Sequence, residues 1–105
     1  MRPISNMSVL ITGGGSGIGE GIARHFCAAG ARVTISGRRA GKIDDVATSL
    51  GDNCRAVVGD ITIAADRLAM VAAAAEHGHG RLDVLVNNAG NMYRGPLAEL
   101  EEQQL

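Results

Sequence analysis

Aromatic residues are nearly absent from this 105-residue sequence, which has one Phe, one Tyr and no Trp. Hydrophobic residues nevertheless make up 46% of the chain, which excludes a disordered protein. The core must therefore be built from Val, Ile, Leu and Ala. The length is enough for one small domain with a real core and too short for two.

An excess of charge is also missing, because the formal net charge is −1. The chain thus lacks the excess of positive charge that binding to nucleic acid or to an anionic membrane surface requires. No segment approaches ~18 consecutive apolar residues, so no transmembrane helix is expected. The first six residues contain no hydrophobic stretch of signal-peptide length. We therefore expect a cytoplasmic chain that binds neither nucleic acid nor membrane.

Clusters of cysteine and histidine are absent as well. Cys27 and Cys54 have no motif spacing, and we interpret both as buried, reduced and structural, with Cys54 just before a strand. His77 and His79 have no cysteine or carboxylate cluster beside them, which favours a surface loop over a metal pair. The sequence therefore predicts no metal site.

The sequence does contain an alternation of short apolar runs and amphipathic segments. The apolar runs predict strands at Val9–Thr12, Val33–Ser36, Ala56–Val58 and Leu82–Val86. Helical spacing marks three helices between them. Ile18, Ile22 and Phe26 mark the buried face of the first. The second is marked by Ile43, Val46, Ala47 and Leu50, and the third by Leu68, Val71, Ala72 and Ala75. Gly30 and Gly51 are expected to end the first two helices. The third is expected within roughly Ala64–Glu76, and Leu97–Leu105 has the pattern of a further helix start.

This alternation predicts an α/β fold. Short strands that are nearly continuous in apolar residues are typical of parallel strands covered on both faces. Successive β-α units with right-handed crossovers produce a doubly wound parallel sheet, here with the expected strand order 3-2-1-4. A ligand would bind at the carboxyl ends of the strands, by the switch point between strands 1 and 4.

The first predicted strand runs directly into a glycine-dense turn with the spacing Thr12-Gly13-x-x-x-Gly17-x-Gly19. Free N–H groups at a helix N-terminus favour an anion, and glycines let it approach the main chain. The spacing differs from G-x-G-x-x-G, and the Lys-Ser/Thr pair of a P-loop is missing. A glycine-rich loop without a ligand is the alternative. The flanking strand and helix favour a cradle for the pyrophosphate of a dinucleotide.

Two further motifs follow predicted strands: Asp60-Ile61-Thr62 after the third and Asn87-Asn88-Ala89-Gly90 after the fourth. Together with the glycine turn, and in this order, they resemble the N-terminal part of a classical short-chain dehydrogenase/reductase. The resemblance covers essentially all 105 residues. It implies a Rossmann-like sheet made of the β-α-β-α-β-α-β portion. Residues 1–105 would then be a single dinucleotide-binding domain that is truncated at its C-terminus relative to the family.

The resemblance also implies roles for individual residues. The residues expected to surround the pyrophosphate and the adjacent ribose are Gly13, Gly15, Ser16, Gly17, Ile18 and Gly19. Asp60 would accept a hydrogen bond from the adenine amino group, with the Ile61 main chain beside the ring, although a helix N-cap or turn residue is the alternative for Asp60. Asn88, Ala89 and Gly90 would pass under the adenosine ribose. Asn87 is expected to tie adjacent strand ends together with its amide, and an ordinary turn is the alternative for this pair of asparagines.

The end of the second strand predicts which dinucleotide binds. Its sequence, Ser36-Gly37-Arg38-Arg39, has no carboxylate to hold the ribose hydroxyls of NAD or to repel a 2′-phosphate. A guanidinium can bind that phosphate through charge-assisted hydrogen bonds, and Arg38 is the first choice and Arg39 the second. Two solvated arginines are the alternative. Ser16 weakens the case for NADP, because many NADP-preferring relatives carry a basic residue at this position. The prediction is NADP in preference to NAD.

The residues that perform the family's chemistry are not found. That chemistry needs a Tyr with a Lys four residues later, plus an upstream Ser and an Asn, so that the Tyr can exchange a proton as hydride moves. The single tyrosine, Tyr93, is followed four residues later by Leu97, and the single lysine is Lys42. We therefore assign no catalytic residue and predict that this chain alone is inactive.

Two functions follow from these patterns. The favoured one is the cofactor-binding part of an NADP-dependent oxidoreductase that moves hydride between NADP(H) and a small alcohol or carbonyl substrate. The alternative is a non-catalytic nucleotide-binding module complete at 105 residues. The strand at 82–86 has one charge and no proline to protect an open edge. We therefore expect either that further residues complete the sheet or that two chains associate through this region into a homo-oligomer.

Overall fold

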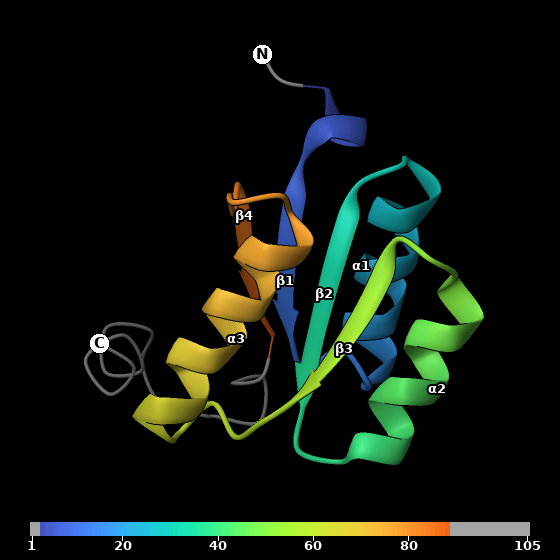
Figure 1. The fold of residues 1–105 in the computed structure, drawn as a ribbon. Coiled ribbons are helices and arrows are strands. Elements are labelled where there is room, and N and C mark those ends of the chain that lie inside the picture. The colour runs from blue at the N-terminus through green and yellow to red at the C-terminus, as the bar shows by residue number, and fades with distance from the viewer. Residues whose placement is uncertain (1–2, 89–105) are drawn as a thin grey trace, which may run out of the picture.

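Strands and helices alternate along residues 3–88, the part of the chain that the computed structural model describes (Figure 1). The elements are a short 3-10 helix at Ile4–Asn6, β1 (Ser8–Thr12), α1 (Gly17–Ala28), β2 (Arg32–Gly37), α2 (Ala40–Leu50), β3 (Cys54–Val58), α3 (Ala64–His77) and β4 (Val84–Asn87). The four strands form one sheet in the order β3-β2-β1-β4, and every neighbouring pair is parallel. The predicted fold class and strand order are confirmed. The predicted helix at 97–105 lies outside the described residues.

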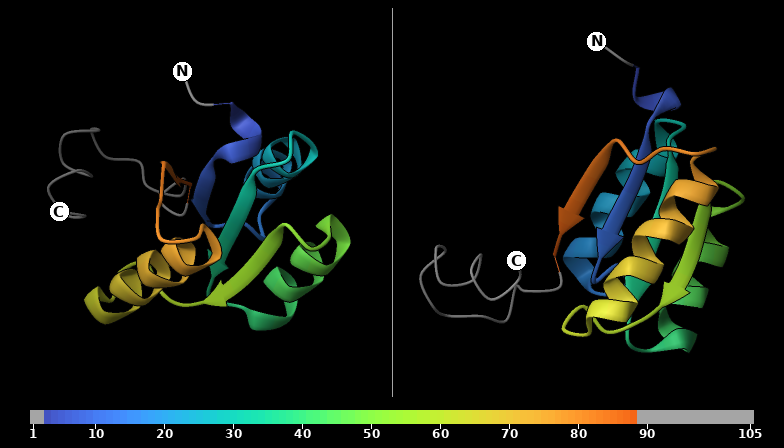
Figure 2. Two further views of the ribbon diagram at one scale, coloured as in Figure 1. Left: turned by 45° about the horizontal axis from the view of Figure 1, so that its top comes forward. Right: turned by 60° about the vertical axis from the view of Figure 1, so that its left-hand side comes forward.

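The sheet is covered on both faces, as the two views of Figure 2 show. On one face, α1 and α2 pack on the sheet around a core that includes Val9, Ile11, Val33 and Ile35. On the other face, Met70 and Ala74 of α3 pack against Leu10. Every residue of β1 is buried, because this strand lies inside the sheet between the two helical layers.

Both predicted helix ends are confirmed. Gly30, with φ of +92°, follows the C-cap of α1, and Gly51, with φ of +96°, is the C-cap of α2. Such positive φ angles cost glycine little because it has no Cβ.

The predicted face of α1 is wrong at its start. Ile18 is 63% exposed, whereas Gly19 and Ala23 are buried against the sheet. These two residues have little or no side chain, so the helix approaches the sheet closely at the points where they lie. Ile22 and Phe26 remain partly buried beside this line of contact.

The third helix is confirmed, but the residues that marked it do not form its buried face. Leu68 and Val71 are 73% and 43% exposed, and the buried residues are Met70 and Ala74. These two are four residues apart and therefore share one face of the helix. Leu68, Met70 and Val71 are all large and apolar, so the size of a side chain alone does not tell which face of α3 contacts the sheet.

The strands β1 and β2 each start one residue earlier than predicted, and the starts of β3 and β4 differ by two residues. Cys54 opens β3 instead of preceding it, and β4 begins at Val84, two residues later than expected. Leu82 packs against the cluster around Leu10 before the strand starts.

The two cysteines lie together in the core between α1 and β3. Cys54 is buried, Cys27 is partly buried, and the two thiols are within hydrogen-bonding reach of each other. Burial raises the pKa of the Cys54 thiol to about 12, so this thiol is protonated at neutral pH. The interpretation of both as reduced structural residues agrees with this environment. Nearby, His77 ends α3 with its Nε2 atom 2.8 Å from the Asn53 carbonyl, so it is not part of a surface loop.

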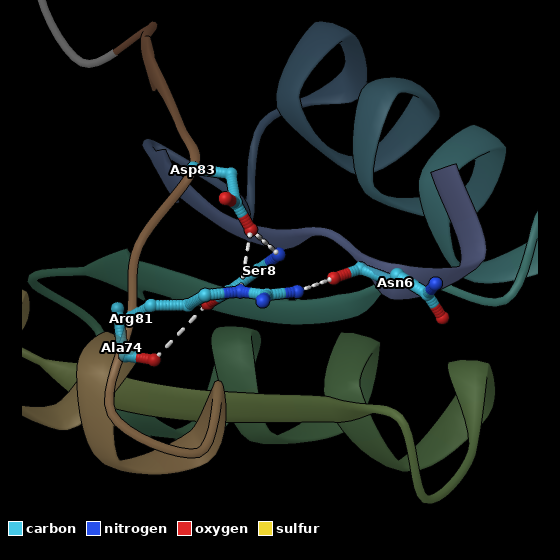
Figure 3. A network of polar contacts seen from close by, with 5 residues as sticks. All are labelled: Asn6, Ser8, Ala74, Arg81 and Asp83. Atoms are coloured by element: carbon cyan, nitrogen blue, oxygen red, sulfur yellow. Dashed lines mark hydrogen bonds and ion pairs between the residues drawn. The ribbon is translucent and has the colours of Figure 1, made fainter. Parts of the chain in front are cut away.

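A polar network holds the amino end of the sheet to α3 (Figure 3). The Ser8 hydroxyl donates to the Ala74 carbonyl at 3.2 Å, and the Ser8 N–H donates to the Asp83 carboxylate at 2.8 Å. The Arg81 guanidinium lies 3.4 Å from that carboxylate and also donates to the Asn6 carbonyl. The start of β1 is thereby joined to the end of α3 and to the segment that leads into β4.

Thr34, in the middle of β2, is fully buried, and its hydroxyl has no partner among the described residues. An unsatisfied buried hydroxyl costs free energy, so we expect Thr34→Val to raise the free energy of unfolding by about 1 kcal/mol in a urea titration. Thr12→Val is the matched control, because the Thr12 hydroxyl is bonded to Asn87 and Asn88, and it should destabilise the chain. A destabilised Thr34→Val variant would show that the hydroxyl is satisfied.

Candidate dinucleotide-binding site

The glycine turn after β1, the arginine segment after β2 and the asparagine segment after β4 meet at the carboxyl ends of the strands. The parallel register places Thr12, the last residue of β1, opposite Ser36 of β2 and Asn87 of β4. The carboxyl ends of these three strands therefore lie side by side, and the glycine turn leads from the end of β1 into α1. This is the position in an open α/β sheet where ligands bind, next to the switch point between β1 and β4.

The glycine turn is fixed by bonds to one carbonyl. Gly13 has a positive φ of +69°, and its carbonyl accepts hydrogen bonds from the Ser16 N–H at 3.2 Å, the Ser16 hydroxyl at 2.9 Å and the Asn88 side chain at 3.2 Å. Ser16 is the N-cap of α1, and its hydroxyl accepts from the Gly19 N–H at 3.2 Å. The turn is thus held in shape by the protein alone.

Asn88 has a bonding role that the sequence analysis missed. Its side-chain amide donates to both the Gly13 carbonyl and the Ser16 hydroxyl, the latter at 2.9 Å, and its N–H donates to the Thr12 hydroxyl at 3.0 Å. The expected role of Asn87 is confirmed, because Thr12 donates to its side-chain oxygen at 3.1 Å. One feature of the sequence indicated that these asparagines could contact the glycine turn. Both stand at the end of the strand that was expected to lie next to β1. Ala89, Gly90 and Tyr93 lie outside the described residues.

The outer side of the turn is open. A Cβ placed on Gly17 would meet nothing within 4 Å, and the neighbouring Ile18 is mostly exposed. Among the described residues, the N–H groups of Gly17 and Ile18 have no hydrogen-bond partner, whereas that of Gly19 is capped by Ser16. Two free donors at the positive end of a helix, beside open space, fit a phosphate group. The chain therefore has the donors and the room that a pyrophosphate requires.

Asp60 lies in the segment between β3 and α3. Its Oδ1 atom accepts from the Thr62 hydroxyl at 2.6 Å and from the Thr62 N–H at 2.9 Å. These two bonds, and the nearby positive charge of Arg38, lower the pKa of the Asp60 carboxyl, which is therefore ionised at neutral pH. Asp60 shapes the turn but does not cap α3, whose N-cap residue is Ile63. Both bonds end on Oδ1, so among the described residues Oδ2 remains available to another donor.

The two arginines after β2 are exposed. Arg38 acts electrostatically on Asp60, toward β3. Arg39 occupies the N-cap position of α2 and lines a hollow of about 600 Å³ with Glu20 of α1. The side chain of Ile61 belongs to the core cluster of Leu10, Met70 and Ala74, and its carbonyl accepts from Arg67 at 2.8 Å.

In residues 3–88, no three His, Cys, Asp or Glu side chains gather closely enough to hold a metal ion. None of the helices in that part of the chain has the length and apolar character needed to cross a membrane.

Residues 7–105 match the short chain dehydrogenase family. The chain belongs to that family. Similar curated members include oxidoreductase asL5 of Sarocladium schorii, 39% identical over 104 residues, and a cis-2,3-dihydrobiphenyl-2,3-diol dehydrogenase of Paraburkholderia xenovorans, 35% identical over 99 residues. The matches cover 99% and 93% of this chain but 41% and 35% of those proteins. The chain thus spans well under half the length of these short-chain dehydrogenases.

Solved short-chain dehydrogenase structures share the fold. The 3-ketoacyl-(acyl-carrier-protein) reductase of Brucella melitensis, solved in complex with NADH, superposes with a TM-score of 0.74 at 41% identity, over 78% of this chain and 34% of that one. The apo-form glucose dehydrogenase of Caenorhabditis elegans gives a TM-score of 0.75 at 30% identity, over 96% of this chain and 43% of that one. This short-chain dehydrogenase chain therefore carries the nicotinamide-dinucleotide-binding fold of an oxidoreductase family.

Proposed function

We propose that this chain is the cofactor-binding part of an NADP-preferring short-chain dehydrogenase/reductase, which transfers hydride between NADP(H) and a small alcohol or carbonyl substrate. The observation that carries the proposal is the glycine turn. It is held by Ser16 and Asn88, yet among the described residues its Gly17 and Ile18 N–H groups have no hydrogen-bond partner, and the space beside Gly17 is open. When bound, the nicotinamide supplies or accepts the hydride. The residues of this chain hold the dinucleotide and exchange no proton with the substrate.

The proposed pose follows the order of the strands. With the pyrophosphate on the first turn of α1, the adenosine extends across the end of β2 toward Asp60 at the end of β3, because β2 lies between β1 and β3 in the sheet. The ionised Asp60 carboxylate would accept the adenine amino group, beside the Ile61 main chain. Gly13, Gly15 and Gly19 form the turn itself, and Asn88, Ala89 and Gly90 would lie under the ribose.

The proposed preference for NADP rests on the segment after β2. Positions 36–39 carry two arginines and no carboxylate, so a 2′-phosphate meets attraction and no repulsion there. The Brucella melitensis reductase was solved with NADH, which makes cofactor choice the property to measure.

Arg38→Ala should weaken NADP binding about ten- to hundredfold, because one charge-assisted contact to the phosphate is lost. Binding of NAD should change less than about twofold. Isothermal titration with each dinucleotide measures both, and Arg55→Ala, an exposed cation on β3, is the matched control for loss of one charge. Equal losses for the two dinucleotides would remove Arg38 from the phosphate site.

We also propose that the protein is a cytoplasmic homo-oligomer. β4 is the outer strand of the sheet among the described residues, and its Leu85 is 57% exposed. An open strand edge with an exposed apolar side chain favours association. Light scattering on the purified protein measures this, and a single monomeric species would refute it.

A further inference from the structure

Lys42 is the single lysine of the chain, and its side chain lies against the glycine turn. Lys42 belongs to the first turn of α2, yet a Cβ placed on Gly15 would lie 3.0 Å from its Cγ and 3.7 Å from its Cε. The hydrocarbon part of the side chain therefore runs across Gly15. The ammonium group, one bond beyond Cε, is carried to the border between the turn and α2.

The position of Lys42 is set by its buried neighbour. Ile43 is 2% exposed and belongs to the core between α2 and the sheet, and its Cγ2 would lie 3.4 Å from the same Cβ on Gly15. Since Ile43 fixes this turn of α2, the backbone of Lys42 is held beside the glycine turn.

The charges around Lys42 are mixed. The hollow of about 600 Å³ between α1 and α2 is lined by Lys42 and Arg39 together with Glu20 and Asp45. Glu20 is paired with Arg24 at 2.9 Å. Among the described residues, no ion pair or hydrogen bond engages the Lys42 ammonium or the Asp45 carboxylate. Lys42 is thus a cation without a fixed partner, and Asp45 is the negative charge that faces it from its own helix.

The other polar groups near the turn differ from Lys42 in charge or in position. The Ser16 hydroxyl contacts Gly13, Gly19 and Asn88 and carries no charge. Arg38 acts on Asp60, on the side of β3. A phosphate on a ribose placed between the turn and the end of β2 would therefore meet Lys42 from α2 and Arg38 from the end of β2.

We infer that Lys42 binds the phosphate on the adenosine ribose of NADP and is a specificity-determining residue of this chain. The inference rests on the proposed dinucleotide site and its NADP preference. It adds a contact from α2 to the arginines after β2, so that the phosphate is held from two sides. It also assigns an opposing role to Asp45, whose carboxylate repels the same phosphate.

The test compares two pairs of probes, NADP with NAD and 2′,5′-ADP with 5′-AMP, by isothermal titration. Lys42→Ala should weaken binding of NADP and of 2′,5′-ADP by about tenfold or more and change NAD and 5′-AMP by less than about twofold. Lys42→Arg should keep most of the affinity. Asp45→Asn should strengthen NADP and 2′,5′-ADP severalfold. Arg55→Ala again controls for the loss of one exposed cation, and circular dichroism checks that each variant is folded.

The outcomes separate the two proposals. If the unaltered protein prefers NADP and Lys42→Ala keeps the same preference, the inference about Lys42 is overturned and the proposed function stands. If the unaltered protein binds NAD as well as NADP, or binds neither, the NADP preference fails and the role of Lys42 fails with it.

Discussion

Gly19→Ala is expected to abolish dinucleotide binding and to destabilise the chain, whereas Gly17→Ala should leave the fold intact. A Cβ on Gly19 would overlap the Gly13 carbonyl oxygen and lie 2.8 Å from the Asn88 side-chain nitrogen and 2.9 Å from the Gly13 carbonyl carbon. Backbone cannot move aside as a flexible side chain can. The added methyl group must therefore open the turn or push α1 away, at a cost of about 1–3 kcal/mol or more.

Gly17 is the matched position, because a Cβ there meets nothing within 4 Å. We expect Gly17→Ala to melt at the same temperature as the unaltered chain. Gly17→Val should also fold, but its branched side chain would fill the space beside the free N–H groups and block the pyrophosphate. Thermal denaturation and a cofactor titration on the three variants separate loss of fold from loss of binding. Normal binding by Gly17→Val, or a normal melting temperature and affinity for Gly19→Ala, would mean that the site lies elsewhere.

Gly78→Ala is expected to have the largest effect on stability outside the glycine turn. A Cβ at this position would overlap the hydroxyl and the Cβ of Ser8 and the carbonyl oxygen of Arg81. Ser8 is 2% exposed and is held by Ala74 and Asp83, so it has no room to move (Figure 3). The variant should lose about 3 kcal/mol, at the upper end for overpacked sites. A loss of that size corresponds to a fall of roughly 12–24 °C in the melting temperature of a domain of this length.

Gly21→Ala is the control for Gly78→Ala. Gly21 lies in α1, and a Cβ there meets nothing within 4 Å. Alanine is the better helix former, so this variant should gain about 0.5–1 kcal/mol. Differential scanning calorimetry on both variants gives the comparison. If Gly78→Ala melts like the unaltered chain, the contact between the end of α3 and the start of β1 is not the one described.

The order of the strands and the position of the glycine turn at the carboxyl end of β1 could be predicted from the sequence, because both follow from repeated β-α units and from glycines at a strand end. The faces of the helices could not be predicted fully. Periodicity tells which residues share a face of a helix. It does not tell which face contacts the sheet when apolar residues lie on more than one face. In α1 the contact goes through Gly19 and Ala23, so Ile18 is exposed. In α3 it goes through Met70 and Ala74, and Leu68 is exposed.

The bonds that shape the site could not be predicted for a different reason. Asn88 reaches Gly13 only because β4 pairs with β1, and no local pattern reports a contact between residues 75 positions apart. Lys42 shows the same limit. Its contact with Gly15 depends on how deeply Ile43 is buried between α2 and the sheet, which is a property of packing and not of spacing.

The Asn88 side chain also sets an order of events during synthesis. The glycine turn is synthesised long before Asn88, because Gly13 and Asn88 are 75 positions apart in the chain. Until β4 joins β1, the Gly13 carbonyl and the Ser16 hydroxyl lack this donor, and the turn is free to take other conformations. The cradle is therefore finished by the last described strand, after three β-α units have emerged. A dinucleotide in the cell then stabilises the chain only from that moment, by mass action on the completed sheet.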